Sequence, residues 1–265
     1  MENLEKHYFE VAGVVPKARP FEIIAQPNND TLVILIHGFS SSPISLHPMA
    51  EYLASQGLDI AVPLLAGHGG SLEKLKQTSY QDWIKSVEDV FLAKSKQYQK
   101  IFIIGYSFGI NIGLYLSVRY PAAVKGIISL GTFIFFKKKE RLLRFLFPFD
   151  KLFPNITFER TWAKDKSILA DLGKQARIPL HNMKQVAYLI DNFTKKELAK
   201  VKSPTLIIHS RDDEVGDSFS SEYLFNHMTI EDKSLFILNK HDHNPVVNSQ
   251  ENRVFNTVVN FIKSH

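Results

Sequence analysis

A serine set between two glycines is the residue of this 265-residue sequence whose type and setting best suit chemistry. Ser107 stands in the G-x-S-x-G pattern Gly105–Gly109, after the apolar run Ile101–Ile104 and before an apolar stretch that ends at Arg119. This order predicts a buried strand, a tight turn and a helix. In such a turn the glycines admit the sharp bend, and the serine hydroxyl stands clear of the backbone where a base can reach it. The pattern therefore predicts a nucleophilic serine.

The competing interpretation is that Ser107 only caps the helix that follows it, as serines often do. A cap requires neither an apolar strand directly before the serine nor a glycine on each side. Both features are typical of the turn that carries a nucleophile, so the nucleophile is favoured.

A serine nucleophile needs a base and an acid that orients the base. Two later apolar runs predict strands, and each leads into candidates for these roles: Asp212 and Asp213 follow Thr205–His209, and His241 and His243 follow Ser234–Leu238. Because ligand-binding groups of open α/β sheets gather at the carboxyl ends of the strands, these side chains are expected beside Ser107. The order serine, acid, histidine is the order of an α/β-hydrolase.

The rest of the chain predicts a sheet that can position these groups. Strands are expected at 31–36, 58–63 and 126–130, amphipathic helices at 46–55, 79–95 and 250–263, and one or two edge strands between residues 8 and 26. This alternation favours an α/β fold, with a mostly parallel central sheet flanked by helices. Residues 1–130 and 203–265 would form this core. Residues 131–202 interrupt the alternation and predict a helical cap insertion.

Several motifs together resemble a known family. They are His37-Gly38-Phe39 followed by Ser-Ser-Ser-Pro, the stretch Pro63–Gly69 ending in Gly-His-Gly, the helix start Tyr80-Gln-Asp-Trp83, the turn Gly105–Gly109, and Ser210–Val215. With them the chain resembles bacterial monoacylglycerol lipases and small carboxylesterases of the α/β-hydrolase superfamily. The resemblance covers nearly the whole core and is loosest in the insertion.

The resemblance implies which acid and which base act. Asp213 is the implied acid because it stands two residues before a valine, and Asp212 is its competitor one residue away. His243 is the implied base because His243-Asn-Pro is similar to the family's His-x-Pro, and His241 is its competitor. The acid would accept a hydrogen bond from the imidazole and fix its tautomer.

The resemblance also implies an oxyanion hole built from the backbone N–H groups of Phe39 and Phe108. The side chains of both residues would then line an apolar substrate pocket, together with Phe133 and Phe135 of the insertion. Two further histidines, His37 and His68, resemble structural histidines of the family and are assigned no catalytic role.

Composition argues against other classes of function. The net charge of +5 comes without a basic repeat or an aromatic RNA-binding signature, which argues against a nucleic-acid partner. The absence of cysteine excludes disulfides, thiolate catalysis and cysteine metal sites. His241-Asp242-His243 offers too few ligands of recognisable spacing, so neither a metal nor a cofactor is expected. The sequence shows no leader pattern and no apolar run of about 18 residues, so a cytoplasmic protein is expected.

The expected function is hydrolysis of a carboxylic ester with an apolar acyl chain, and the resemblance points to a monoacylglycerol. An acyltransferase or thioesterase using the same residues is the alternative, and a catalytically silent ligand-binding protein is the rival from another class. The insertion also interleaves phenylalanines with Lys/Arg residues between 137 and 144. This face either touches an anionic membrane or micelle surface transiently, or packs on the core with its lysines solvated.

Overall fold

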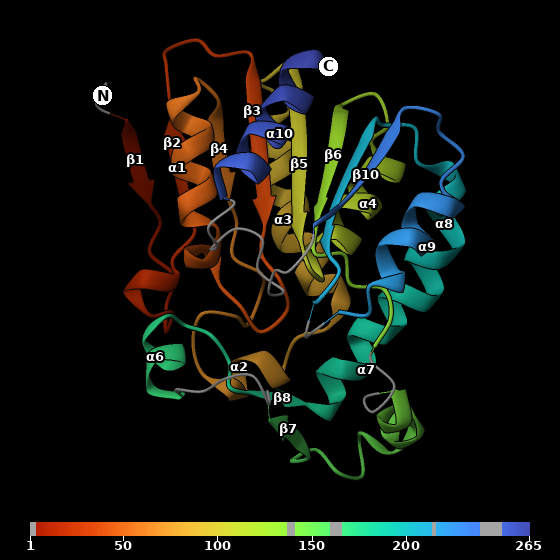
Figure 1. Cartoon of the computed structure of the whole chain (residues 1–265). Helices are drawn as coiled ribbons and strands as arrows, with labels where there is room; N and C mark the ends of the chain where they lie inside the picture. The colour runs from red at the N-terminus through yellow and green to blue at the C-terminus, as the bar shows by residue number, and fades with distance from the viewer. Residues whose placement is uncertain (1–3, 137–140, 160–165, 214–215, 239–250) are drawn as a thin grey trace.

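One eight-stranded sheet positions the residues singled out above. The structure is a computed structural model, and it describes residues 4–136, 141–159, 166–213, 216–238 and 251–265. The strands of the sheet are β1 (Glu5–Tyr8), β2 (Phe21–Ile24), β3 (Thr31–Ile36), β4 (Asp59–Val62), β5 (Lys100–Tyr106), β6 (Val124–Leu130), β9 (Thr205–Ser210) and β10 (Lys233–Leu238). They lie in the order β1-β2-β4-β3-β5-β6-β9-β10 (Figure 1). Only β2 runs in the direction opposite to the other strands, so the prediction of a mostly parallel sheet is confirmed.

The central strands β3 and β5 are buried on both faces because nearly every residue in them is apolar and many are β-branched. Their parallel register pairs Ile36, the last residue of β3, with Gly105 near the end of β5. The loop after β3 and the turn after β5 therefore leave the sheet side by side.

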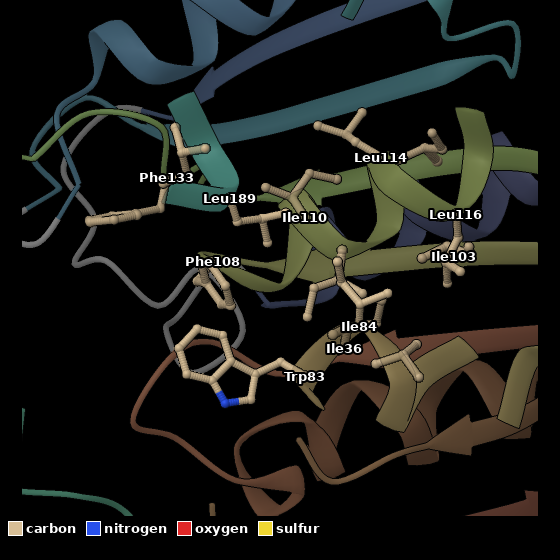
Figure 2. Close-up of a cluster of buried hydrophobic side chains, with 14 of the residues drawn as sticks. Ile36, Trp83, Ile84, Ile103, Phe108, Ile110, Leu114, Leu116, Phe133 and Leu189 are labelled. Carbon is tan, nitrogen blue, oxygen red and sulfur yellow. The ribbon is translucent and has the colours of Figure 1, made fainter. Parts of the chain in front are cut away.

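Helices cover both faces of this sheet. On one face lie α1 (His47–Ser55) and α10 (Glu251–Ser264), and on the other lie α3 (Tyr80–Lys94), α4 (Gly109–Arg119) and α9 (Phe219–His227) (Figure 1). The helix α3 begins at a capping box, in which Ser79 and Asp82 satisfy each other's backbone N–H groups. Its apolar stripe places Trp83 and Ile84 against α4 in the larger of two hydrophobic clusters (Figure 2).

The chain between β6 and β9 forms a series of short elements. They are η3 (Leu142–Phe149), β7 (Thr157–Glu159), α6 (Lys166–Asp171), β8 (Arg177–Pro179), α7 (Leu180–Leu189), the π-helix η4 (Ile190–Thr194), α8 (Lys195–Glu197) and η5 (Leu198–Lys200). In Figure 1 β7, β8 and α7 lie beyond the carboxyl ends of the parallel strands, whereas α8 lies beside α9. The division into a core and a cap stays a prediction.

Four short elements escaped the sequence patterns. The antiparallel pair β7 and β8 has three residues in each strand, too few to show an alternating pattern. Similarly, α2 (Leu72–Lys76) is little more than one turn, and β1 is exposed along its whole length. The remaining short 3-10 turns are η1 (Pro16–Ala18) and η2 (Pro43–Leu46). Among the residues described, no helix combines the length and the apolar character that crossing a membrane requires.

Candidate active site

Ser107 lies in the turn between β5 and α4 with a backbone that serine rarely adopts. Its φ is +53°, in the left-handed region. The helix α4 has Phe108 at its N-cap, without any side-chain cap hydrogen bond, so the alternative that Ser107 caps this helix is not supported. The N–H of Ser107 donates to the carbonyl of Leu130 at 2.8 Å, which ties the turn to the end of β6. A strained residue held by its surroundings is typical of a nucleophile turn.

The glycines of this turn are required by close contacts. A Cβ atom on Gly105 would lie 2.3 Å from the Cα atom of Ile110, and one on Gly109 would lie 2.3 Å from the carbonyl oxygen of Ile36. Both contacts are with backbone, which cannot move aside as a flexible side chain can. The G-x-S-x-G spacing therefore lets helix α4 start directly against the ends of β3 and β5.

The two residues predicted to form the oxyanion hole lie on adjacent loops. A Cβ atom on Gly38, the residue before Phe39, would lie 3.2 Å from the Cβ atom of Ser107. The rings of Phe39 and Phe108 meet edge to face with centroids 5.7 Å apart. Within the described ranges, neither backbone N–H has a hydrogen-bond acceptor. Their assignment to the oxyanion hole stays a prediction.

Two buried histidines hold the loop that carries Phe39. The Nε2 atom of His37 accepts the N–H of Leu65 at 3.1 Å, and the Nε2 atom of His68 accepts the N–H of Ser40 at 3.1 Å. Burial, with the nearby His68 adding to it, lowers the pKa of His37 to about 3, and burial lowers the pKa of His68 to about 4. Both imidazoles are therefore neutral at pH 7, which suits a structural role rather than proton transfer.

The two candidate acids lie in different environments. The side chain of Asp213 is buried, and its Oδ1 atom accepts the N–H of Gly216 at 2.8 Å. Its Oδ2 atom lies 3.4 Å from Nε2 of the fully buried His209. Asp212, in contrast, is exposed. A carboxylate that must hold an imidazole in one orientation is better fixed at the buried position, which favours Asp213.

Both candidate bases, His241 and His243, lie outside the described residues, and so does the stretch His241-Asp242-His243, at which no metal site is expected. The strand that leads to them, β10, ends at Leu238, whose carbonyl accepts the N–H of Arg211 at 2.9 Å. The end of β10 therefore lies next to the loop that holds Asp213. In the part of the chain that is described, no three potential ligands gather to hold a metal ion.

Hydrogen bonds across the carboxyl edge set the spacing of the site. Gly131 donates its N–H to the carbonyl of Ile208 at 2.9 Å, so β5, β6, β9 and β10 leave the sheet as consecutive neighbours. Adjacent strands lie about 4.8 Å apart, which places the loops after β5 and β9 roughly 10 Å apart.

The predicted pocket residues occupy two places. Phe133 belongs to the same buried cluster as Phe108 and Leu189 (Figure 2). Phe135 instead packs against Phe219 and Tyr223 of α9, with ring centroids 5.3 and 5.0 Å away. The pocket assignment of both residues stays a prediction.

Sequence patterns missed one polar residue directly behind the turn. Asn111, in the first turn of α4, is fully buried, and its amide donates to the carbonyls of Phe108 at 3.0 Å and Phe133 at 2.9 Å. Its Oδ1 atom accepts the hydroxyl of Thr194 at 2.9 Å. The only signal in the sequence is an amide within the otherwise apolar run Ile110–Leu116.

Comparisons with known proteins show which chains this one is similar to. The chain is 25% identical to a thermostable monoacylglycerol lipase of Bacillus sp. (strain H-257) over 95% of this chain and 97% of that protein. It is 24% identical to a carboxylesterase of Bacillus subtilis (strain 168) over 94% of this chain and 97% of that protein. A solved structure from work on the metagenome-derived lipolytic enzymes LipS and LipT superposes with a TM-score of 0.83 at 22% identity, covering 95% of this chain and all of that one.

These comparisons confirm the predicted resemblance and the predicted fold class. A family model described as "Serine aminopeptidase, S33" matches residues 27–250, from the loop before β3 to the residue before α10. The match thus includes Ser107, both candidate acids and both candidate bases. The chain belongs to this family of serine hydrolases, and its fold is that of an α/β-hydrolase.

Proposed function

We propose that this chain hydrolyses carboxylic esters through an acyl-enzyme. Ser107 attacks the ester carbonyl, and His243 takes the serine proton and delivers it to the leaving alcohol. Asp213 orients His243, while the N–H groups of Phe39 and Phe108 bind the oxyanion. Water, activated by the same histidine, then releases the acid. The observation that carries this proposal is the left-handed backbone of Ser107 at the carboxyl edge of the sheet.

The substrate that fits best is an ester with an apolar acyl chain, such as a monoacylglycerol. Two nearly full-length relatives support this proposal, one named a monoacylglycerol lipase and the other a carboxylesterase. The side chains around the turn add to it, because Phe39, Phe108 and Trp83 pack edge to face next to Ser107. A cytoplasmic location is part of the same proposal and rests on the sequence alone.

Initial rates across esters of graded acyl length test this proposal, with mono-, di- and triacylglycerols in the same series. We expect Ser107-dependent hydrolysis that favours longer acyl chains and monoacylglycerols. Faster turnover of a matched thiol ester, or transfer to an added alcohol in preference to water, would favour a thioesterase or an acyltransferase. Failure of the wild-type chain to react with a fluorophosphonate probe would indicate a silent binding protein.

We also propose that residues 141–153, called the lid segment below, touch an anionic membrane or micelle surface. Two of its charged side chains tie it to the rest of the chain: Arg144 pairs with Asp191 of η4, and the buried Asp150 lies 2.9 Å from Nδ1 of His181 and 2.7 Å from Nζ of Lys184. Burial alone would raise the pKa of Asp150, but hydrogen bonds from Lys184 and His181 outweigh it and lower this pKa below its ordinary value. The segment is therefore fixed to α7 and η4 through charges.

Most apolar side chains of the lid segment whose burial is described are exposed, whereas Phe147 is buried in the core. Leu142, Phe145 and Leu152 have relative exposures of 66, 75 and 71%, and Arg141 and Lys151 are exposed on the same segment. An outward apolar face flanked by basic residues is the arrangement of an interfacial segment that binds anionic lipid. Contact with such a surface would bring the lid segment and the carboxyl edge of the sheet to the source of an apolar substrate.

A further inference from the structure

We infer that Asn111 is a positioning residue for ester hydrolysis, because its side chain fixes the backbone of Phe108 and thereby the direction of the Phe108 N–H. The inference rests on the proposed function, since that N–H matters only as a donor to the oxyanion. Asn111 itself lies behind the turn and is fully buried.

The contacts of Asn111 use its hydrogen-bonding groups in one orientation. Its two amide hydrogens go to the carbonyls of Phe108 and Phe133, at 3.0 and 2.9 Å, and its oxygen accepts the hydroxyl of Thr194 at 2.9 Å. Since carbonyl oxygens can only accept, the reversed amide would lose both of the first two bonds. The backbone N–H of Asn111 also donates to Phe108, at 3.0 Å. The Phe108 carbonyl is therefore held from two sides.

An asparagine here is not explained by packing. Its neighbours along α4 include Ile110, Ile112 and Leu114, all buried. Asparagine is a poorer helix former than leucine, and burying its amide is unfavourable unless every polar atom finds a partner. The pairing of the amide with two carbonyls and a hydroxyl gives the local backbone one defined arrangement. That arrangement includes the backbone of Phe108, the residue directly after Ser107.

The partner of Asn111 comes from an unusual helix. Thr194 is buried and ends η4, a π-helix that interrupts the helical run from α7 to α8. π-helical turns are rare and occur often at functional sites. From the end of this turn the hydroxyl of Thr194 reaches Asn111 of α4.

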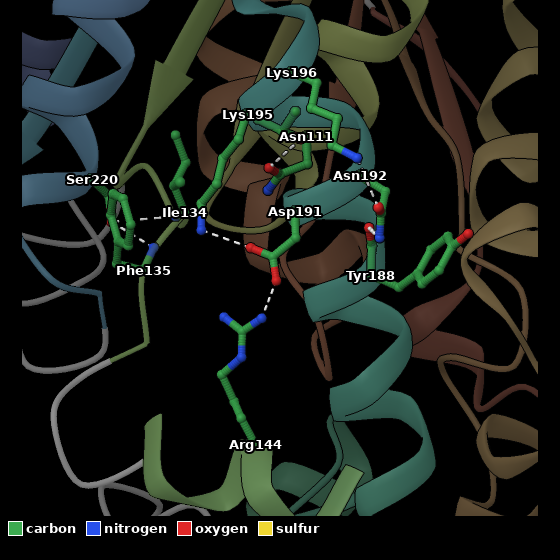
Figure 3. A network of polar contacts seen from close by, with 11 residues as sticks. Asn111, Ile134, Phe135, Arg144, Tyr188, Asp191, Asn192, Lys195, Lys196 and Ser220 are labelled. Atoms are coloured by element: carbon green, nitrogen blue, oxygen red, sulfur yellow. Dashed lines mark hydrogen bonds and ion pairs between the residues drawn. The ribbon is translucent and has the colours of Figure 1, made fainter. Parts of the chain in front are cut away.

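The same π-helix is fixed by charges. Asp191 pairs with Arg144 of the lid segment, and Lys195 lies 2.7 Å from its other carboxylate oxygen. Figure 3 shows Arg144 and Lys195 on the two carboxylate oxygens of Asp191, in the same view as Asn111. Burial would raise the pKa of Asp191, but hydrogen bonds from Lys195 and Arg144 outweigh it and lower this pKa below its ordinary value. Thr194 is therefore presented to Asn111 by an anchored element.

The catalytic consequence follows from the geometry of an oxyanion hole. A donor stabilises the transition state only when its N–H points at the developing negative charge, and a displacement of about 1 Å can cost about 100-fold in rate. If the backbone at Phe108 shifts when the amide of Asn111 is removed, the Phe108 N–H no longer points at the developing charge. In that case kcat falls while binding of the ground-state ester changes little. This split between kcat and KM separates positioning from a merely structural role.

The test compares the wild-type chain with Asn111→Ala, Thr194→Val and Thr194→Ser. Thr194→Val keeps the shape of the side chain but removes the hydroxyl that orients Asn111, and Thr194→Ser restores that hydroxyl. Asn182→Ala is the matched control, because Asn182 is also fully buried and also donates to two carbonyls, those of Leu75 at 2.9 Å and Thr78 at 3.0 Å. The readouts are kcat and KM for a soluble ester, and inhibition by an alkylboronic acid and by a fatty acid.

We expect kcat of Asn111→Ala to fall by about 10- to 100-fold with KM within about threefold of wild type. Inhibition by the boronic acid, whose serine adduct is tetrahedral, should weaken by a similar factor, and inhibition by the fatty acid should not change. Thr194→Val should show a smaller loss in the same direction, reversed in Thr194→Ser. The kcat of Asn182→Ala should equal that of the wild type when it is calculated per folded molecule. Circular dichroism measures the folded fraction.

Different outcomes overturn different statements. A wild-type chain without Ser107-dependent hydrolysis overturns both the proposed function and this inference. An active wild type whose kcat and boronate inhibition survive Thr194→Val and Asn111→Ala overturns the inference alone. Equal losses of kcat in Asn182→Ala and Asn111→Ala do so as well. If Asn111→Ala fails to fold, Thr194→Val and Thr194→Ser decide the matter, because both keep Asn111.

Discussion

The imidazole rings of His37 and His68 meet edge to face, with their centroids 5.3 Å apart. Each ring accepts a backbone N–H from the loop to which the other histidine belongs, Leu65 for His37 and Ser40 for His68. An imidazole nitrogen accepts a hydrogen bond only when it carries no proton. The loop that carries Phe39 therefore keeps its shape only while both rings are neutral.

This relationship predicts a loss of stability in mild acid. Above the ordinary histidine pKa of 6.5 both rings are neutral whether the chain is folded or unfolded. As the pH falls below 6.5, both histidines become protonated in the unfolded chain. In the folded chain His68 becomes protonated only near pH 4 and His37 only near pH 3. Each ring thus lowers the free energy of unfolding by about 1.4 kcal/mol per pH unit in this window.

Urea unfolding between pH 7 and pH 4.5 measures this effect. His68→Gln removes one of the two rings, so its free energy of unfolding should depend on pH less steeply than that of the wild type, whatever its stability at pH 7. Identical slopes for the two proteins would contradict a neutral, buried His68.

Ser107→Ala should lower kcat by about 10⁴-fold or more, because it removes the nucleophile and leaves the backbone in place. Ser107→Gly should be equally inactive. Since glycine adopts a positive φ without penalty, Ser107→Gly should be more stable than Ser107→Ala. Its free energy of unfolding should be higher by about 1 kcal/mol. Kinetics and urea unfolding check both statements. Normal turnover in either variant would end the nucleophile assignment, and equal stabilities would contradict strain at Ser107.

Asp213→Asn should lower kcat by about 10⁴-fold, because an amide can hold the imidazole in the wrong tautomer. Asp212→Asn is the matched control one residue away, with an exposed side chain, and should stay within about threefold of wild type. The measurement is kcat for a soluble ester at a pH where the wild type is fully active. A large loss in Asp212→Asn with normal turnover in Asp213→Asn would exchange the two assignments.

His243→Ala should lose turnover to about the same extent as Ser107→Ala, because the two residues act as one unit. His241→Ala should retain it. Fluorophosphonate labelling complements the kinetics, since Ser107 without its base should react far more slowly with the probe. The reverse pattern, with labelling lost only in His241→Ala, would assign the base to His241.

The parts of the fold that the sequence predicted are those fixed by local pattern. Thr31–Ile36 was predicted from an uninterrupted apolar run and matches β3 residue for residue. The capping box at Ser79 and Asp82 located the start of α3 for the same reason. The turn at Ser107 needed only its glycines and its flanking elements. Each of these features is set by residues within a few positions of one another.

The parts that the sequence did not predict depend on distant contacts. Asn111 and Thr194 are 83 residues apart, and neither has a local feature that identifies the other. The π-helix η4 likewise packs against α4, an element far away in the sequence. The burial of Asp213 and the exposure of Asp212 follow from how the loop after β9 turns. In the sequence the two residues are neighbouring aspartates, and nothing there shows which one is buried. A single sequence does not reveal these features, because contacts between distant segments determine them.

The lid segment should bind vesicles that contain phosphatidylglycerol more tightly than vesicles of phosphatidylcholine alone. Replacing the exposed Phe145 and Leu152 by serine should weaken binding by about tenfold or more, since each side chain contributes about 1.5–3 kcal/mol when fully buried in an apolar phase. Leu92→Ser is the control, because Leu92 is also exposed but lies on α3. Co-sedimentation measures binding, and turnover of a soluble ester reports folding. Equal binding by the double variant and the control would exclude the lid segment as the contact surface.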